Sequence, residues 1–183
     1  MDTYQERNWK KPFLKVIAKY GLTGSLVSII AFILLTQIKA NLVISNLLTT
    51  ALILILFVFF SMKEFRDLYN NRELHFWHGI LLGSATYLCI AVLTGIFNFI
   101  YLEWISPEVI EVYRQIQRQY LEANKEMMTD QRGAAWYNEA YLMVEKVNAI
   151  DIAVDFFLKK LLIGIFVTII ISVILRKVPK AYL

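Results

Sequence analysis

The sequence predicts an all-α integral membrane protein with four transmembrane helices and an extramembrane antiparallel helical hairpin between the third and the fourth. Hydrophobic residues make up 58% of the chain and charged residues 19%, which is too apolar for an ordinary soluble domain. Long apolar runs occupy residues 21–38, 42–62, 79–102 and 161–175. A polar insert, residues 103–160, separates the third run from the fourth, and this block cannot lie in lipid.

The predicted spans cover about residues 16–38, 42–62, 79–102 and 152–175. A bilayer core about 30 Å thick needs roughly 20 apolar residues per helix, and a helix satisfies its own backbone in lipid. The fourth span reaches this length only when residues 152–160 are included, which places Asp155 and Lys159 in its outer turns. A signal peptide in place of the first span is the alternative, but no small-x-small cleavage site follows that run.

Basic residues are distributed unevenly along the chain. Five precede the first span, three lie in the second loop and three in the C-terminal tail, whereas the insert has seven basic and ten acidic residues. By the positive-inside rule, both termini and the second loop are predicted to be cytoplasmic and the insert to face outward. The net charge of +4 therefore reflects topology and contact with membrane lipid. The sequence has no nucleic-acid-binding signature, so we expect no such partner.

The insert is predicted to form two helices joined by a turn at residues 129–133. Pro107 and Glu108, which follow Ser106, are typical of a helix start. Apolar side chains recur with 4-3-4-3-4 spacing in each half, as in a two-helix seam: Val109, Tyr113, Ile116, Tyr120, Ala123 and Met127, then Trp136, Ala140, Met143, Val147, Ile150 and Val154. We expect a projecting hairpin over residues 103–151, about 30 Å long. Its second arm should continue unbroken into the fourth span, because no Gly or Pro lies between Gly133 and Gly164. Arms lying flat on the membrane are the alternative.

The hairpin is the part of the chain expected to meet a protein partner or a second copy. Tyr137 and Tyr141 lie off the predicted seam, so we interpret them as exposed contact residues. This interpretation makes the chain a non-enzymatic accessory or scaffold protein of the membrane. No phosphate-binding loop, Ser/His/Asp order or Cys-His pair is present. The sequence therefore favours a role without enzymatic activity and without a cofactor, and a membrane enzyme is the third alternative.

Polar residues within the predicted spans are few, and each span places some of them in the outer leaflet. Thr36, Thr49 and Lys160 lie there, beside the candidate cluster residues Gln37, Asn46, Thr50, Thr94, Asn98, Asp155 and Lys159. Intramembrane polar groups are candidates for function, and one hypothesis is a small hydrophilic vestibule that opens outward. The alternative is a purely structural role, in which these groups form hydrogen bonds between helices. A small oligomeric transporter or channel built around these groups is the alternative function.

His75 and His78, with Glu73 and Asp67 nearby, are the one candidate metal constellation in the sequence. Two histidines at this spacing share a helix face, and a third ligand would complete a zinc site. They flank Phe76 and Trp77 at the membrane surface, where histidine is an ordinary interfacial residue. We therefore predict no bound metal.

Three stretches resemble a known family: KEFRD at residues 63–67, FWHG at residues 76–79 with Gly83, and FNFIY at residues 97–101 followed by Pro107. With these motifs the chain resembles domain-of-unknown-function family 4199, uncharacterised bacterial membrane proteins found chiefly in Bacteroidota. The resemblance extends from the first span to the last. It implies a four-span protein of the bacterial inner membrane with an extended segment before the last span, and it implies no activity, substrate or catalytic residue.

Overall fold

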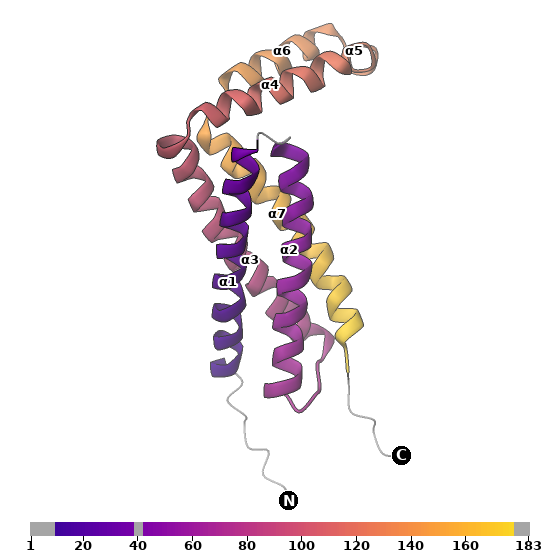
Figure 1. Ribbon diagram of the computed structural model, residues 1–183. Helices are drawn as coiled ribbons and strands as arrows, with labels where there is room; N and C mark the ends of the chain where they lie inside the picture. Colours follow the sequence, from indigo (N-terminus) through magenta and orange to yellow (C-terminus); the bar gives the residue numbers. More distant parts are fainter. Residues whose placement is uncertain (1–9, 39–41, 178–183) are drawn as a thin grey trace, which may run out of the picture.

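The computed structural model describes residues 10–38 and 42–177, and almost all of them are helical. The elements, shown in Figure 1, are α1 (Lys10–Gln37), α2 (Leu42–Glu64), the π-helical turn η1 (Phe65–Tyr69), α3 (Phe76–Ile100), the π-helical turn η2 (Tyr101–Ile105), α4 (Glu108–Ala123), α5 (Lys125–Arg132), α6 (Ala134–Lys146) and α7 (Ala149–Leu175). Within the described ranges there is no β-strand, and a single β-bridge joins Leu74 to Lys177.

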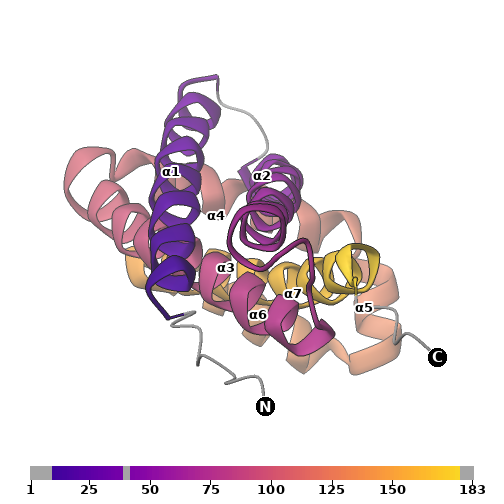
Figure 2. The same cartoon turned by 90° about the horizontal axis from the view of Figure 1, so that it is seen from below.

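Four of these helices are long and apolar enough to cross a membrane, namely α1, α2 with η1, α3 with η2, and α7. The predicted all-α fold with four such helices is therefore confirmed. The four form a bundle in which α3 packs against α1 and α7, and α2 packs against the same two helices from the other side (Figures 1 and 2). Large side chains exposed on the bundle are mostly apolar, as expected for a surface that faces lipid.

The bundle is held together by close helix packing and by one polar contact near the end at which residue 10 lies. There Glu64 of α2 accepts hydrogen bonds from Lys19 Nζ at 2.5 Å and from Tyr20 Oη at 2.6 Å, both on α1. Further along, Gly164 of α7 lies against the ring of Tyr87 on α3. The absence of a side chain at residue 164 lets these two helices approach closely.

The polar insert forms α4, α5 and α6, which we call the cap helices. They lie across one end of the bundle, roughly crosswise to the long helices (Figures 1 and 2). We call this end the capped end. A hairpin of two long arms that projects from the membrane is therefore not supported, and the flat alternative is closer to the structure. The first arm is also interrupted at Asn124, between α4 and α5.

The expectation that the second arm continues unbroken into the fourth span is wrong. α6 ends at Lys146, and α7 begins at Ala149 after Asn148. The Asn148 side chain accepts hydrogen bonds from the backbone N–H groups of Ile150 and Asp151, and the Asp151 carboxylate accepts one from the N–H of Asn148. Such a capping box starts a helix without any Gly or Pro, and the absence of Gly and Pro was the basis of the prediction.

The predicted seam between the arms is also displaced. Tyr120 and Met143 are 57% and 60% exposed, whereas Leu121 and Tyr137, each next to a predicted seam position, are buried. The prediction that Tyr137 is exposed is therefore wrong. The physical reason is that α4 packs against two neighbours, since its first turns lie on the bundle and the helix also contacts α6. A single 4-3 repeat therefore does not describe its buried face.

Candidate functional site

Four of the predicted polar residues lie inside the bundle, on two different helices. Asn46 and Thr50 of α2 are buried, as are Thr94 and Asn98 of α3. Gln37 is exposed at the end of α1, so its predicted place in the cluster is wrong: a polar residue at the end of a span reaches the surface easily. The other four are buried, as groups that face the interior of the bundle must be, whereas Asp155 and Lys159 are partly exposed.

Lys160 completes this group; the sequence placed it beside Lys159 at the outer end of the fourth span, but not among the candidate cluster residues. It lies on α7 and is only 3% exposed. Its Nζ donates a hydrogen bond of 2.9 Å to Thr94 Oγ1. We call Asn46, Thr50, Thr94, Asn98 and Lys160 the polar cluster. The spacing of Lys160, four residues from both Phe156 and Gly164, which are also buried, was the sequence signal that placed it on the inner face of α7.

The charge of Lys160 has no counter-charge in the described part of the chain. The neighbouring Lys159 pairs with Asp155 at 2.5 Å, and Tyr113 of α4 donates a hydrogen bond of 3.2 Å to the same carboxylate oxygen. Lys160 has no such ion pair and one side-chain hydrogen bond, to Thr94. An unpaired ammonium inside a membrane bundle costs several kcal/mol, on the order of 3 or more by insertion measurements.

Asn98 is the second unusual member of the polar cluster. It is 1% exposed, and neither its amide nitrogen nor its amide oxygen has a hydrogen-bond partner among the described residues. A buried polar group without a partner costs about 1–3 kcal/mol, so such groups are rare in folded proteins. Asn98 lies one helical turn from Thr94, the residue that holds Lys160.

A narrow crevice between α2 and α7 leads to the polar cluster. Its volume is about 10 Å³, which is room for about one water molecule. The residues that line it come from the two helices: Asn46, Leu47, Thr50, Phe156, Lys159, Lys160 and Ile163. Leu47 and Lys159 are partly exposed, so they form its outer rim.

An apolar layer separates the polar cluster from the cap helices. It is formed by buried side chains from α1, η2, α4 and α7: Phe32, Tyr101, Leu102, Val109, Tyr113, Ala149, Ile152 and Phe156. The ring of Phe156 lies edge-on to Phe32 and to Tyr113. Burial, together with the nearby Asp155 carboxylate, raises the pKa of Tyr113 to about 12, so its hydroxyl remains a donor at physiological pH.

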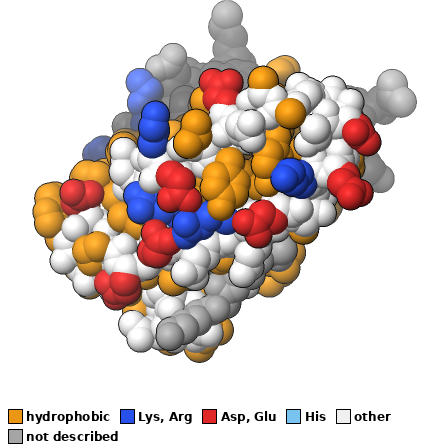
Figure 3. Space-filling view, turned by 90° about the horizontal axis from the view of Figure 1, so that it is seen from above, with side chains coloured by type: hydrophobic (Ala, Val, Ile, Leu, Met, Phe, Trp, Pro, Cys, Tyr) orange, Lys and Arg blue, Asp and Glu red, His pale blue; other side chains and the backbone are white. Residues whose placement is uncertain are grey.

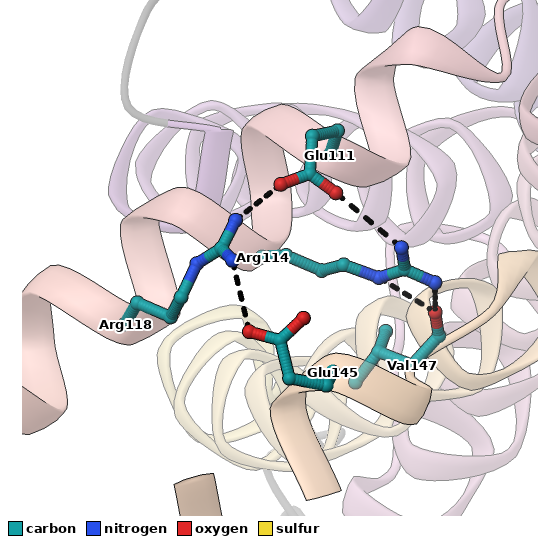
Figure 4. A network of polar contacts seen from close by, with 5 residues as sticks. All are labelled: Glu111, Arg114, Arg118, Glu145 and Val147. Carbon is teal, nitrogen blue, oxygen red and sulfur yellow. Dashed lines mark hydrogen bonds and ion pairs between the residues drawn. The ribbon is translucent and has the colours of Figure 1, made fainter. Parts of the chain in front are cut away.

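Ion pairs and backbone contacts hold the cap helices together (Figure 4). Arg114 of α4 donates from Nε and Nη2 to the carbonyl of Val147, at 3.1 and 2.6 Å, at the junction of α6 and α7. Arg118 bridges Glu111 of α4 and Glu145 of α6. Figure 3 shows acidic and basic side chains intermixed over the outer face of the cap helices.

Replacing Arg114 with methionine should loosen the junction between α6 and α7. Two hydrogen bonds to the Val147 carbonyl are lost, and a bond to a charged group is worth about 1.5–3 kcal/mol. We expect faster amide hydrogen exchange in residues 144–150. Arg118→Met is the matched control, because exposed ion pairs contribute under about 1 kcal/mol. Equal protection in both variants would contradict the role of Arg114.

The ion pairs of the cap helices should also depend on pH. The side-chain hydrogen bond from Arg118 lowers the pKa of Glu111 below its ordinary value of 4.5. The stability contributed by this carboxylate is therefore present above pH 4.5 and is lost as the pH falls through the lower value of the folded state. We expect amide exchange in α4 and α6 to accelerate below that pH at low salt, and Glu111→Gln to weaken this dependence. An unchanged pH profile in that variant would refute the assignment.

The two histidines do not gain further ligands in the structure. The rings of His75 and His78 have centroids 5.4 Å apart. Within residues 10–38 and 42–177, no group of three or more His, Cys, Asp or Glu side chains is placed to hold a metal ion. The prediction of no bound metal stays a prediction.

Tyr137 and Tyr141 line an open hollow of about 520 Å³ on the cap helices. Their rings are tilted against each other with centroids 6.4 Å apart. Lys125 Nζ lies over the Tyr137 ring, 5.5 Å from its centroid, and Glu122 and Leu142 complete much of the rim. The two predicted contact residues thus share one surface feature, although Tyr137 is buried in its wall.

Residues 19–177 match the family described as "Protein of unknown function (DUF4199)". The match covers most of the chain, and the resemblance drawn from the KEFRD, FWHG and FNFIY stretches is confirmed. No curated protein and no solved structure matches the chain closely enough to show a relationship.

Proposed function

The chain belongs to the DUF4199 family, and we propose that it is a multi-pass membrane protein whose polar cluster binds a polar ligand between the helices. The observation that carries this proposal is a buried lysine without a counter-charge together with a buried asparagine whose side chain has no hydrogen-bond partner among the described residues. Lys160 of α7 contacts Thr94 of α3, and Asn98 lies one turn from Thr94 on the same helix. Both are costly in a membrane bundle, and a bound ligand offsets both costs at once.

Several other buried polar residues of the bundle need no such explanation. The hydroxyls of Ser25, Ser61 and Thr86 each donate to a carbonyl one turn back in their own helix. Bonds of this kind satisfy a hydroxyl within a transmembrane helix. Neither Asn98 nor Lys160 is satisfied in this way. Thr168 Oγ1 of α7 is also buried without a hydrogen-bond partner among the described residues, but it lies about two turns from Lys160. The polar cluster is therefore distinguished by an unpaired charge together with an unpaired amide. The narrowness of the crevice favours ligand binding within one copy of the protein over the passage of ions or solutes through it.

Native mass spectrometry of the full chain, extracted from its membrane in mild detergent, tests this proposal. We expect a bound mass on the wild-type protein that is reduced in Asn98→Leu and in Lys160→Met. Thr86→Val is the matched control, because it removes a buried hydroxyl that is bonded within its own helix. A bound mass that is equally abundant in all four proteins would refute the proposal.

The orientation that the charge distribution predicts is part of the proposed function. We place the chain in a bacterial inner membrane, with both termini in the cytoplasm and the cap helices outside. An impermeant maleimide applied to intact cells should label Glu126→Cys, which is exposed on α5, and should not label Lys177→Cys. Both variants are made in a Cys89→Ser background. The reverse labelling pattern would overturn this orientation.

The hollow on the cap helices favours a second role, contact with another copy of the chain. A two-fold interface uses the same patch on both subunits, so the patch must be self-complementary. The rim offers an acid and a base, Glu122 and Lys125, beside the exposed Leu142. A photocrosslinking residue at Tyr141 should yield a covalent dimer in membranes, whereas one at Gln119, outside the hollow, should not. Crosslinking from Gln119 alone would exclude this role.

A further inference from the structure

We infer that the ligand of the polar cluster is the anionic headgroup of a phospholipid, which enters from the bilayer between α2 and α7. This inference rests on the proposed function and adds the chemical class of the ligand and its route.

The polar cluster carries one excess positive charge and is rich in hydrogen-bond donors. Asp155 neutralises Lys159, whereas Lys160 has no acidic partner among the described residues. The ammonium of Lys160 can donate three hydrogen bonds, and the amides of Asn46 and Asn98 can donate two each. This donor set fits an anion with several acceptor oxygens. Basic pockets between transmembrane helices are an established way of holding such headgroups.

The apolar layer at the capped end leaves the side of the bundle as the route to the polar cluster. Phe32 and Phe156 are each less than a tenth exposed and pack with Tyr113 of α4 in this layer. Phe156 lies one turn before Lys160 on α7, on the side of the capped end. The crevice between α2 and α7, by contrast, ends at Leu47, which is 40% exposed on a helix that faces lipid. A ligand that comes through this crevice comes from the bilayer.

The direction of the side chains on α7 brings the amino groups of Lys159 and Lys160 closer to the membrane surface, where lipid headgroups lie. Side chains on a helix point toward its N-terminus, and the N-terminus of α7 is at the capped end. Lys159 and Lys160 therefore reach from the interior of the bundle toward that surface. Asn46, at the upper part of the crevice, is four residues from the start of α2, which is about 6 Å. A phosphate beside Asn46 is within the reach of a lysine that extends along the crevice.

The small volume of the crevice determines how the headgroup is held. About 10 Å³ cannot enclose a phosphate, so the headgroup binds at the rim and Lys160 moves to meet it. Lys160 is held by one side-chain hydrogen bond to Thr94, and its four-carbon stem is flexible. Lys159, a third exposed and paired with Asp155, provides a second cation at the same rim.

Lipid titrations of the full chain test the inference. In native mass spectrometry, wild-type protein in detergent should retain phosphatidylglycerol in preference to phosphatidylcholine. Lys160→Met should reduce this preference at least about tenfold, as expected for the loss of one desolvated charge pair. Asn46→Leu should weaken it as well. Lys63→Met, which removes an exposed charge at the other end of α2, is the matched control and should leave the preference unchanged.

Four results would overturn the inference. An equal preference in wild type and Lys160→Met would show that the polar cluster does not select the headgroup. An equal loss in Lys63→Met would show that only surface charge matters. Stabilisation by inorganic phosphate alone, to the same extent as by the lipid, would make the ligand a free anion. A bound mass that Asn98→Leu removes but that is not an anionic lipid would also refute this inference, while leaving the proposed function intact.

Discussion

Lys160→Met should raise the stability of the bundle, although it removes the residue at the centre of the proposed site. Lys160 is buried and has no counter-charge in the described chain. Replacement of buried ionic groups by apolar residues of similar volume is often neutral or stabilising, by about 1–4 kcal/mol. Methionine keeps the length of the side chain and removes the charge. We expect a higher unfolding temperature of the purified protein in detergent.

Two further variants make this result specific. Lys159→Met should destabilise the bundle, because Asp155 would keep only the Tyr113 hydroxyl as a partner. Lys63→Met should change little, since Lys63 is exposed. A lower unfolding temperature for Lys160→Met would mean that its hydrogen bond to Thr94 is structural. A gain in stability joined to a loss of ligand is instead typical of functional residues that cost stability.

The four long helices could be predicted because run length in apolar residues is a direct physical requirement of the bilayer. The break before α7 could not be predicted from the absence of Gly and Pro, because Asn148 and Asp151 form a capping box with polar side chains alone. The buried face of α4 differs from the predicted seam for a related reason. A periodic pattern predicts one buried face, but α4 packs against α6 and against the end of the bundle.

The polar cluster was found in part because polar residues are rare inside membranes. Asn46 and Asn98 follow from this rule alone, and both are buried. The rule does not say which face of a helix a polar residue occupies. Asp155 and Lys159 were selected as an i,i+4 pair, and Lys160 was therefore not selected. Adjacent residues on a helix point about 100° apart. Lys159 therefore reaches the rim of the crevice while Lys160 reaches its interior, a distinction that required the position of α7 against α3.

The contact between α3 and α7 at Gly164 should be sensitive to a single added carbon. A Cβ at residue 164 would lie 2.6 Å from two ring carbons of Tyr87. Tyr87 is buried and its ring is rigid, so the helices themselves must separate. Overpacking of this kind costs about 1–3 kcal/mol. We expect Gly164→Ala to lower the unfolding temperature clearly.

Gly95→Ala is the matched control for this prediction, on the same pair of helices. A Cβ at residue 95 would lie 3.6 Å from Phe157, an ordinary contact distance, on the wall of an apolar groove between α3 and α7. Alanine is favoured over glycine within a helix by about 1 kcal/mol, so this variant should be neutral or stabilised. A smaller residue at Tyr87, as in the double variant Gly164→Ala with Tyr87→Leu, should recover part of the loss. Equal effects of Gly164→Ala and Gly95→Ala would show that helix propensity, and not close packing against Tyr87, decides the stability of this contact.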